Sequence, residues 1–325
     1  MREYDLIVVG GGISGITAAL TAKENGVENI LILDREFELG GILNCCVHSG
    51  FKNKYSDEVL TAPEYIYLLQ TKIEEYNIDY KTLTNVIEID KSDKIIAISP
   101  EGILNFKSKA IILAMGCRER PLGYKNILSH RCAGIIGAVS TLKLINNKGI
   151  LPGKNVIILG SEDTAIFAAR SLILEGANVK GIIETTNKIK AVSKEAKTFI
   201  KDFNINIMTN TRVTKVIGKG RVESVQITKL NDNKKPIKDT EKLVDCDTLI
   251  LSIYMKPESL IAEKIGIKTK EFGEIVVDKS MQTSAKGIFA CGTVTTGYET
   301  MDKVIKNSEK TAHAALEYLN SLQVI

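Results

Sequence analysis

Residues 5–34 read DLIVVGGGISGITAALTAKENGVENILILD, and this stretch decides the fold. An apolar strand pattern runs into the spacing Gly10-x-Gly12-x-x-Gly15, a helical pattern follows, and a second apolar run ends at Asp34. Gly10 permits a tight turn, Gly12 lets backbone N–H groups approach a diphosphate, and Gly15 lets the helix pack closely on the strand. Asp34 stands where a carboxylate accepts hydrogen bonds from ribose hydroxyls. The stretch therefore predicts a βαβ unit that binds a dinucleotide.

A second stretch of the same kind, VIILGSEDTAIFAARSLILEGANVKGIIE, covers residues 156–184. The residues that match a dinucleotide-binding pattern are Gly160, Ser161, Asp163, Thr164, Ala165 and, at the end of the second strand, Glu184. Glu162 departs from the pattern, because a glycine normally lies against the diphosphate there and a carboxylate adds like charge. Two interpretations stay open: the second unit binds NAD(H), or it has lost nucleotide binding and serves as a scaffold or docking surface. Glu184, with no arginine cluster after it, favours NAD(H) over NADP(H).

The composition bounds the class of protein. A chain of 325 residues has room for about two domains. Lys and Arg number 43 and Asp and Glu number 39, and the net charge of +4 is too balanced to indicate nucleic-acid binding. No apolar stretch is long enough to span a membrane, and a strand pattern begins by residue 5, which leaves no room for a signal peptide. We therefore expect a cytoplasmic protein with reduced thiols.

Strand and helix patterns alternate along the chain, which indicates an α/β fold with parallel sheets. Further strand patterns occupy residues 85–90, 94–98, 103–106, 110–114 and 247–253. Helical patterns occupy residues 63–76, 138–147, 193–203 and 301–320.

Three more segments complete a resemblance to a known class: the pair Gly40-Gly41, the run ILAMG at 112–116 and the run GIFACG at 287–292. Together with the two βαβ units, they make the chain resemble, over nearly its whole length, the two-domain flavoproteins of the pyridine-nucleotide–disulfide oxidoreductase class. The likeness is to the short kind, similar in size to bacterial thioredoxin reductase. It implies two Rossmann-like (three-layer ββα) dinucleotide-binding domains, the second inserted in the first. Residues 1–115 and 255–325 would form a discontinuous FAD-binding domain, and residues 116–254 an NAD(P)-binding-like domain.

The same resemblance implies which residues hold FAD. In that class an aspartate normally follows the last glycine of the run at 287–292 and holds the ribityl hydroxyls, whereas this chain has Thr293, which hydrogen-bonds more weakly. The final helix would point its N-terminus at the isoalloxazine ring. The implied FAD contacts are Gly10, Gly12, Ile13, Ser14, Gly15, Asp34, Arg35, Gly41, Ile42, Val86, Ala114, Gly116, Gly292, Thr293 and Met301.

A closer resemblance rests on GGILNCCVHSGF at 40–51, TAPEY at 61–65 and GCRERP at 116–121. These segments resemble the flavoprotein subfamily that accompanies glycerol-3-phosphate dehydrogenase-like or amine-oxidising partners, including the FAD/NAD subunits of opine and sarcosine oxidases. That subfamily usually reads Gln-Cys-x-His where this chain reads Cys45-Cys46-Val47-His48.

The six cysteines contain no C-x-x-C or C-x4-C pair of the thioredoxin-reductase or glutathione-reductase kind, and no metal-type spacing. One hypothesis makes Cys46 a catalytic redox thiol with His48 as its partner, in a loop that runs near the flavin in this fold. The alternatives are a vicinal disulfide with Cys45, or two small buried groups beside a loop histidine. We expect inert core positions for Cys117, Cys132, Cys246 and Cys291.

These observations predict an FAD-dependent oxidoreductase that takes hydride from NADH onto the flavin and passes electrons to an acceptor or partner subunit. One alternative is an FAD-containing electron-relay or structural subunit of a larger dehydrogenase complex, with a degenerate nicotinamide site. Another is a disulfide or polysulfide reductase that depends on Cys46. The expected partner is a dehydrogenase subunit or a small redox protein. A homodimer is among the expected assemblies, although the chain ends just past the flavin helix, without the C-terminal dimerisation domain of longer members of the class.

Overall fold

The computed structural model describes residues 2–54, 56–90, 94–120, 127–129, 132–253 and 255–323, and these form two compact units. Unit 1 comprises Met1–Asn44, His48–Arg118 and Met255–Ile325, and unit 2 comprises Cys45–Val47 and Glu119–Tyr254. The main changes of unit fall at 118/119 and 254/255, beside the predicted boundaries at 115/116 and 254/255. Pro121, the last residue of the GCRERP segment, lies outside the described residues.

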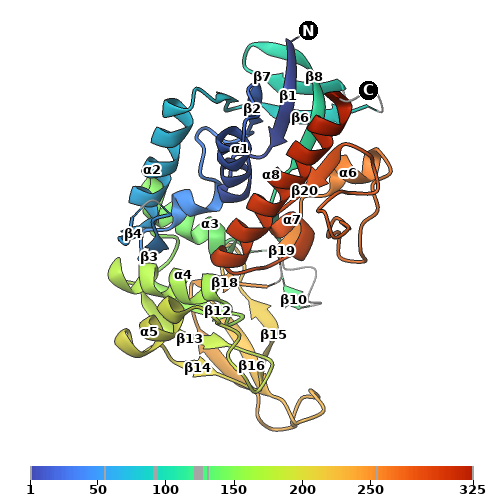
Figure 1. The fold of residues 1–325 in the computed structure, drawn as a ribbon. Coiled ribbons are helices and arrows are strands. Elements are labelled where there is room, and N and C mark those ends of the chain that lie inside the picture. Colours follow the sequence, from blue (N-terminus) through green and yellow to red (C-terminus); the bar gives the residue numbers. More distant parts are fainter. Residues whose placement is uncertain are drawn as a thin grey trace. The chain divides into compact units, whose positions relative to one another are not determined.

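Unit 1 is built on a seven-stranded sheet of order β5-β2-β1-β8-β7-β6, with β20 paired to β8. The pairs among β5, β2, β1, β8 and β20 are parallel, whereas β7 is antiparallel to both β6 and β8. The first half of β8 pairs with β7 and its second half with β20, so one long strand joins a parallel and an antiparallel layer (Figure 1). The strands are β1 (Arg2–Val9), β2 (Ile30–Leu33), β5 (Asp79–Lys81), β6 (Asn85–Ile89), β7 (Lys94–Ser99), β8 (Gly102–Leu113) and β20 (Ile288–Ala290).

The helices of unit 1 are α1 (Ile13–Glu24), α2 (Ala62–Glu75), α6 (Leu260–Lys264), α7 (Thr293–Thr296) and α8 (Met301–Gln323). The long helix α8, red in Figure 1, packs along α1. A capping box starts α2, because the Thr61 N–H donates to Glu64 Oε2 at 2.8 Å while the Thr61 side chain faces the first turn. Smaller elements are η1 (Gly41–Cys45), β3 (Ser49–Lys52), β4 (Val59–Thr61), β9 (Cys117–Glu119) and β19 (Met255–Pro257).

The core of unit 1 explains its apolar strand sequences. Every residue of β2 and the last four residues of β8 are buried, as expected for parallel strands covered on both faces. Each such side chain contributes roughly 1.5–3 kcal/mol relative to exposure. The cluster includes Ile7, Leu31, Leu33, Ile95, Phe106, Ile111 and Leu113.

Unit 2 is built on two separate sheets. A five-stranded parallel sheet has the order β11-β18-β12-β13-β14, and a separate sheet has the order β10-β15-β16-β17. Its core lies where both sheets contribute, with Ile157, Leu249, Val213 and Val225 in one cluster. The strands are β10 (Leu128–Ser129), β11 (Ile135–Gly137), β12 (Asn155–Leu159), β13 (Asn178–Ile183), β14 (Ile207–Met208), β15 (Thr211–Ile217), β16 (Ser224–Lys229), β17 (Lys242–Asp245) and β18 (Thr248–Leu251). The helices are α3 (Ala138–Leu142), the π-helix η3 (Lys143–Asn147), α4 (Asp163–Leu174) and α5 (Lys194–Asp202).

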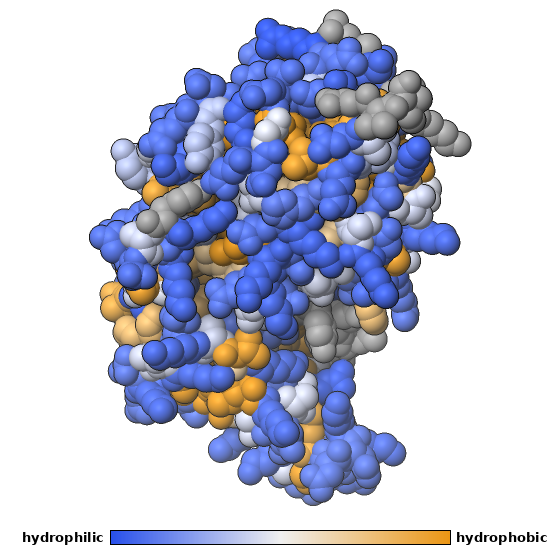
Figure 2. Space-filling view, in the orientation of Figure 1, coloured by the Kyte–Doolittle hydropathy of each residue, from blue (hydrophilic) through white to orange (hydrophobic). Residues whose placement is uncertain are grey.

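The α/β class and the two Rossmann-like units predicted from sequence are confirmed. Two predicted elements differ in detail. The expected strands 103–106 and 110–114 are one continuous strand, β8, and the expected helix 138–147 changes to π geometry at Lys143. Hydrophilic residues cover most of the face in Figure 2, with apolar residues in separate patches. Within the described ranges, no helix combines the length and the apolar character needed to cross a membrane.

Candidate functional site

The first glycine loop leaves an open face at the start of α1. Gly12 precedes the helix with extended backbone, and no side-chain hydrogen bond caps this start among the described residues. A Cβ built on Gly12 would meet nothing closer than the Gly41 Cα at 3.9 Å, so the protein itself does not require glycine there. The missing side chain instead keeps clear the backbone N–H groups of the first turn, which have no partner within the helix. This is the cradle that a diphosphate needs.

Asp34 holds the glycine loop and keeps acceptor capacity. Its Oδ2 accepts from the Gly11 N–H at 2.5 Å and its Oδ1 from the Glu36 N–H at 2.7 Å. The residue is only 7% exposed. A carboxylate offers about four acceptor positions, so among the described residues these two bonds leave about two for ribose hydroxyls.

Two later segments of unit 1 come to the same place. A Cβ on Gly292 would collide with the Ser14 side chain, and a Cβ on Gly116 would lie 3.6 Å from Thr293 Oγ1. The Ala114 N–H donates to the Val9 carbonyl at 2.8 Å, which holds the end of β8 beside the loop. The structure therefore brings together most of the predicted FAD contacts: Gly10, Gly12, Ile13, Ser14, Gly15, Asp34, Gly41, Ala114, Gly116, Gly292 and Thr293.

The other four predicted FAD contacts are not placed beside the glycine loop by any described contact. Val86 lies on β6, and its side chain is part of the unit 1 core. Arg35 forms an ion pair with Glu258, in which Nη2 and Oε1 lie 3.2 Å apart. Ile42 is exposed on η1, and Met301 is the first residue of α8.

The second loop repeats the first in hydrogen-bond detail. The Gly10 N–H donates to Leu33 O and the Gly160 N–H to Ile183 O, at 2.8 and 2.9 Å. Glu162 begins α4 with φ −73° and ψ 166°, close to the φ −76° and ψ −177° of Gly12 at the start of α1. This backbone conformation suits any residue, so Glu162 fits without strain, and its side chain stands at the position that Gly12 leaves open.

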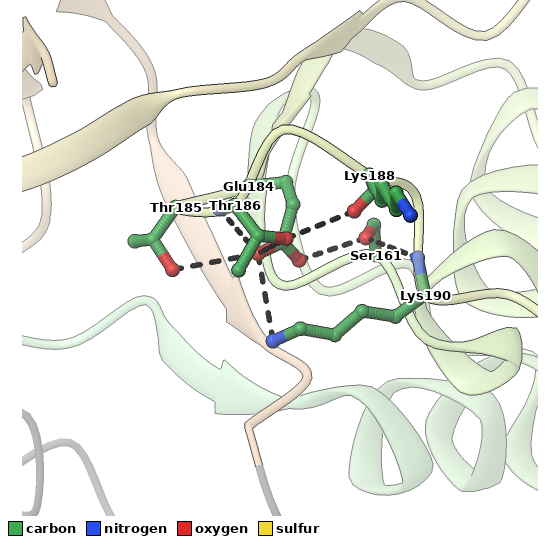
Figure 3. A network of polar contacts seen from close by, with 6 residues as sticks. All are labelled: Ser161, Glu184, Thr185, Thr186, Lys188 and Lys190. Atoms are coloured by element: carbon green, nitrogen blue, oxygen red, sulfur yellow. Dashed lines mark hydrogen bonds and ion pairs between the residues drawn. The ribbon is translucent and has the colours of Figure 1, made fainter. Parts of the chain in front are cut away.

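Glu184, directly after β13, has more hydrogen-bond partners than Asp34 has in unit 1. Figure 3 shows Glu184 between the glycine loop and the loop that follows β13. Its Oε2 accepts from Ser161 Oγ at 2.8 Å, while Oε1 accepts from the Thr186 N–H at 2.9 Å and lies 3.4 Å from Lys190 Nζ. Glu184 is 1% exposed, and its Oε1 also accepts from the Thr186 and Thr185 hydroxyls at 3.0 and 3.4 Å. Among the described residues, about one acceptor position therefore stays for a ribose hydroxyl, and it lies on Oε2.

These contacts set the charge of Glu184. Burial raises the pKa of its carboxyl, but the hydrogen bonds from Ser161 and Thr186 and the ammonium of Lys190 outweigh burial. The net pKa therefore lies below its ordinary value, and the group is a carboxylate at neutral pH.

The other predicted contacts of the second loop bind within unit 2. Asp163 Oδ1 accepts from the Val192 and Ser193 N–H groups at 2.9 and 3.2 Å, which fastens the loop before α5. Thr164 Oγ1 lies 2.9 Å from Ser252 Oγ. Ala165 is buried at the position of Gly15, where a Cβ in unit 1 would collide with the Gly10 carbonyl.

The loop at 45–48 places two thiols side by side in the chain, with His48 two residues further on. Both Cys45 and Cys46 are free thiols. The interaction with Cys45, together with burial, raises the pKa of Cys46 well above its ordinary value, whereas the interaction with Cys46 lowers the pKa of Cys45. His48 Nδ1 lies 2.8 Å from Ser49 O, and the ring stacks on Phe51 at 5.1 Å. The catalytic roles of Cys46 and His48 stay predictions.

Sequence patterns missed several partners. Lys190 and Ser161 were not expected to hold Glu184, and neither Lys143 nor Asn146 was expected near the thiols, because loop contacts follow no sequence period. The only sequence signal for these contacts is the opposite charge of Lys190, six residues after Glu184. No three His, Cys, Asp or Glu side chains of the described ranges group closely enough to hold a metal ion.

Comparison with known proteins assigns the chain to a family. The sequence profile described as pyridine nucleotide-disulphide oxidoreductase matches residues 4–317. One component of the alkyl hydroperoxide reductase of Staphylococcus aureus is 26% identical over 298 residues, which cover 90% of this chain and 54% of that relative. The chain thus spans about half the length of that protein. A 34.2 kDa protein in the rubredoxin operon of Clostridium pasteurianum is 24% identical, covering 90% and 89% of the two chains.

Solved structures show the same fold. Thioredoxin reductase of T. acidophilum superposes with a TM-score of 0.78 at 23% identity, over 99% of this chain and 100% of that one. Bacillithiol disulfide reductase of Bacillus cereus superposes with a TM-score of 0.75 at 15% identity, over 98% and 100%. The family match over nearly the whole length, with two glycine loops on two Rossmann-like units, leads to one conclusion: the chain belongs to the pyridine nucleotide-disulphide oxidoreductase family.

Proposed function

We propose that this oxidoreductase binds FAD in unit 1, takes hydride from NADH held by unit 2, and passes the electrons to a separate acceptor. The observation that carries the proposal is the glycine-lined cradle of unit 1. There no side chain of the described residues caps the start of α1, Gly12 leaves space beside Gly41, and Asp34 keeps acceptor positions. Bound FAD supplies the two-electron chemistry, while the protein supplies position and electrostatics.

The residues of unit 1 would divide the work of holding FAD. The N–H groups at the start of α1 face the diphosphate, and Asp34 accepts from the ribose hydroxyls. Thr293, at the start of α7 beside Gly116, offers a hydroxyl to the ribityl chain in place of the usual aspartate. A neutral hydroxyl binds more weakly than a carboxylate, so we expect this contact to be the weakest of the three.

For unit 2 we propose NADH as the nucleotide. Glu184 is a buried carboxylate at the ribose position, and a 2′-phosphate there would meet its negative charge. Lys190 is already paired with Glu184. These contacts favour the unphosphorylated ribose.

An anaerobic absorbance titration tests the main proposal. The flavin-loaded protein is titrated with NADH and, in a parallel sample, with NADPH. We expect NADH to bleach the flavin absorption band at ~450 nm, where free flavins absorb, and NADPH to act only at much higher concentration. Bleaching by dithionite with none by NADH would contradict hydride transfer from NADH.

A second candidate function is an FAD-containing relay whose nicotinamide site is degenerate. Glu162 favours it, because its carboxylate stands at the diphosphate end of α4, where Asp163 already adds negative charge. Glu162→Gly separates the two candidates. If unit 2 binds NADH against this repulsion, the variant should bind NADH about tenfold more tightly, since roughly 1.4 kcal/mol of repulsion is removed.

The matched control is Glu175→Gln, which removes the same charge at the exposed opposite end of α4. It should leave the NADH dissociation constant unchanged. If Glu162→Gly and Glu175→Gln both leave NADH binding undetectable by calorimetry, the relay is the better description.

We further propose a small redox protein as the electron acceptor, with a partner dehydrogenase subunit as the alternative. The names of the two relatives support an external acceptor, since one belongs to a peroxide reductase and the other lies in a rubredoxin operon. A third candidate, a disulfide or polysulfide reductase that uses Cys46, is favoured by the partial exposure of this thiol and by the second thiol, Cys45, directly before it in the chain. Homodimer formation also remains a proposal.

A further inference from the structure

A small pocket opens in unit 1 between the helices α1, α2 and α8, beside strand β3. Its volume is about 70 Å³, and residues of all three helices line it, together with Lys52 and Lys54. Helix α1 packs against both α2 and α8 (Figure 1). None of the residues that line the pocket is among the predicted FAD contacts, so the pocket is distinct from the proposed flavin contacts.

The inner wall of the pocket is apolar, and its size limits what it can hold. Leu20 and Leu69 are 2% and 5% exposed, and Ile305 is partly buried beside them in the lining. In another protein, a cavity of ~150 Å³ holds one benzene molecule. The pocket of about 70 Å³ has roughly half that volume, which suits a hydrocarbon chain of roughly three carbons.

Two side chains with hydroxyl groups, Thr17 and Tyr65, also line the pocket. They are 7% and 3% exposed, and neither hydroxyl has a hydrogen-bond partner among the described residues. One turn further along α1, the buried Thr21 hydroxyl also has no partner within the described ranges. Burial raises the pKa of Tyr65 to about 12, with smaller contributions from Glu309 and Asp302, so this hydroxyl keeps its proton. Because buried hydroxyls are nearly always hydrogen-bonded, the lining favours a ligand with an acceptor group.

Two ammonium groups give the rim of the pocket its charge. Lys54 Nζ lies 3.4 Å from Glu24 Oε2 and 3.3 Å from Glu309 Oε1, so its charge is already matched. Lys52 is exposed and, among the residues that the structure describes, forms no ion pair. An ammonium can only donate hydrogen bonds, and a carboxylate can only accept them. The charge of Lys52 therefore favours an anionic head group at the rim.

We propose that this pocket binds a short aliphatic monocarboxylate. The hydrocarbon chain packs against Leu20 and Leu69, where it leaves water. The carboxylate accepts hydrogen bonds from Thr17 and Tyr65 and pairs with Lys52 at the rim. An alcohol of the same length lacks the charge that Lys52 attracts, and an amine would meet a like charge there. The proposed electron transfer plays no part in this binding, because every group of the pocket belongs to unit 1 and none is a predicted FAD contact.

The test is a ligand-observed NMR titration of the flavin-loaded full chain with sodium butyrate, without NADH. The probes n-butanol and n-butylamine have the same chain length and differ in the head group. We expect saturable binding of butyrate, about tenfold tighter than that of either other probe, since hydrogen bonds to a charged group are the stronger ones. Butanol that binds as tightly as butyrate, or butyrate that binds only to the apoprotein and is displaced by FAD, overturns the proposal.

Matched variants locate the site. Tyr65→Phe keeps the ring, which stacks on Phe51, and removes only the hydroxyl, so butyrate binding should weaken about tenfold. Its control is Tyr67→Phe, on the same helix but 73% exposed, which should change nothing. Lys52→Met should weaken binding about threefold, as expected for an exposed ion pair, while Lys107→Met, exposed on β8, should have no effect. Butyrate binding that is unchanged in both Tyr65→Phe and Lys52→Met overturns the proposal.

Discussion

Gly15 and Ala165 occupy the same position in the two units, one turn into the helix after each glycine loop. In unit 1 a Cβ at this position would collide with the Gly10 carbonyl, whereas unit 2 accommodates the methyl group of a fully buried alanine. Helix α1 therefore approaches its loop more closely than a side chain would allow. Close approach brings the helix N-terminus to a diphosphate, so this residue pair distinguishes the two sites.

We predict that Gly15→Ala destabilises the protein and empties the flavin site. Overpacking against a backbone carbonyl costs about 1–3 kcal/mol, which outweighs the gain of about 1 kcal/mol in helix propensity. Urea unfolding and the ratio of flavin to protein absorbance measure the two effects. The control is Ala165→Gly, which should cost about 1 kcal/mol through propensity and leave the flavin ratio unchanged. A flavin ratio that stays normal in Gly15→Ala would show that close approach is unnecessary.

Glu184 gives a pH-dependent prediction. Its folded pKa lies below the unfolded value, for which the ordinary glutamate value is 4.5. A lowered pKa contributes stability that is fully present above the unfolded value and is lost as pH falls through the folded one. Glu184→Gln should therefore cost about 1–3 kcal/mol at pH 7, and the cost should shrink below about pH 4.5. Urea unfolding at pH 7 and pH 4 measures this, and a cost that does not depend on pH would assign the effect to packing instead of charge.

Many residues of the candidate site, but not all of their contacts, could be predicted from the sequence. Gly10, Gly12 and Asp34 were predictable because each answers a local requirement of a strand–turn–helix. The engagement of Glu184 by Ser161 and Lys190 was not, because the contact depends on how a loop without periodic pattern folds back. The surroundings of Cys45 were not predictable for a similar reason, because its carbonyl accepts a hydrogen bond from Asn146, about a hundred residues later in the chain.

At the scale of elements, Asp163 ties two helices together. It lies in the first turn of α4, and its carboxylate accepts from the N–H groups of Val192 and Ser193, just before α5. The segment between β13 and α5 is thus held at both Ser161 and Asp163. This segment carries Lys190 and borders the proposed ribose position.

We predict that Asp163→Ala costs about 1–3 kcal/mol, because two backbone donors lose a charged acceptor. The segment at 185–193 should become the first site of limited proteolysis. Asp202→Ala at the exposed end of α5 is the control and should change stability by less than about 0.5 kcal/mol. Equal cleavage in both variants would show that Ser161 alone suffices to hold the segment.

The order of elements was largely readable from sequence. Strand and helix periods gave β1, β2, β12, β13 and α8, since long periodic segments carry a strong signal. The change to π geometry at Lys143 was not predictable, because it depends on packing around an otherwise ordinary helical sequence. The grouping of Cys45–Val47 with unit 2 depends on tertiary contacts in the same way.

At the scale of the molecule, each unit has its own core and its own glycine loop. We predict that FAD added to apoprotein slows hydrogen exchange in the peptides that contain residues 10–15, 34–41, 114–116 and 292–301, and leaves 160–165 unchanged. NADH should protect 160–165 and 184–193 instead. Exchange followed by mass spectrometry measures both, with adenosine as a control ligand that lacks the diphosphate. Protection of both loops by FAD alone would contradict the assignment of one nucleotide to each unit.

The uncapped start of α1 also bears on the fate of a newly made chain. Without FAD, the N–H groups at the start of the helix have no side-chain cap from the part of the chain that the structure describes and no diphosphate, so this end should be among the first parts to open. A ligand present at a hundred times its dissociation constant adds about 2.7 kcal/mol to the folded state. A difference of that size decides how much of a protein escapes proteases in a cell. The supply of flavin would then set the abundance of the protein as well as its activity, through the lifetime of chains that wait for it.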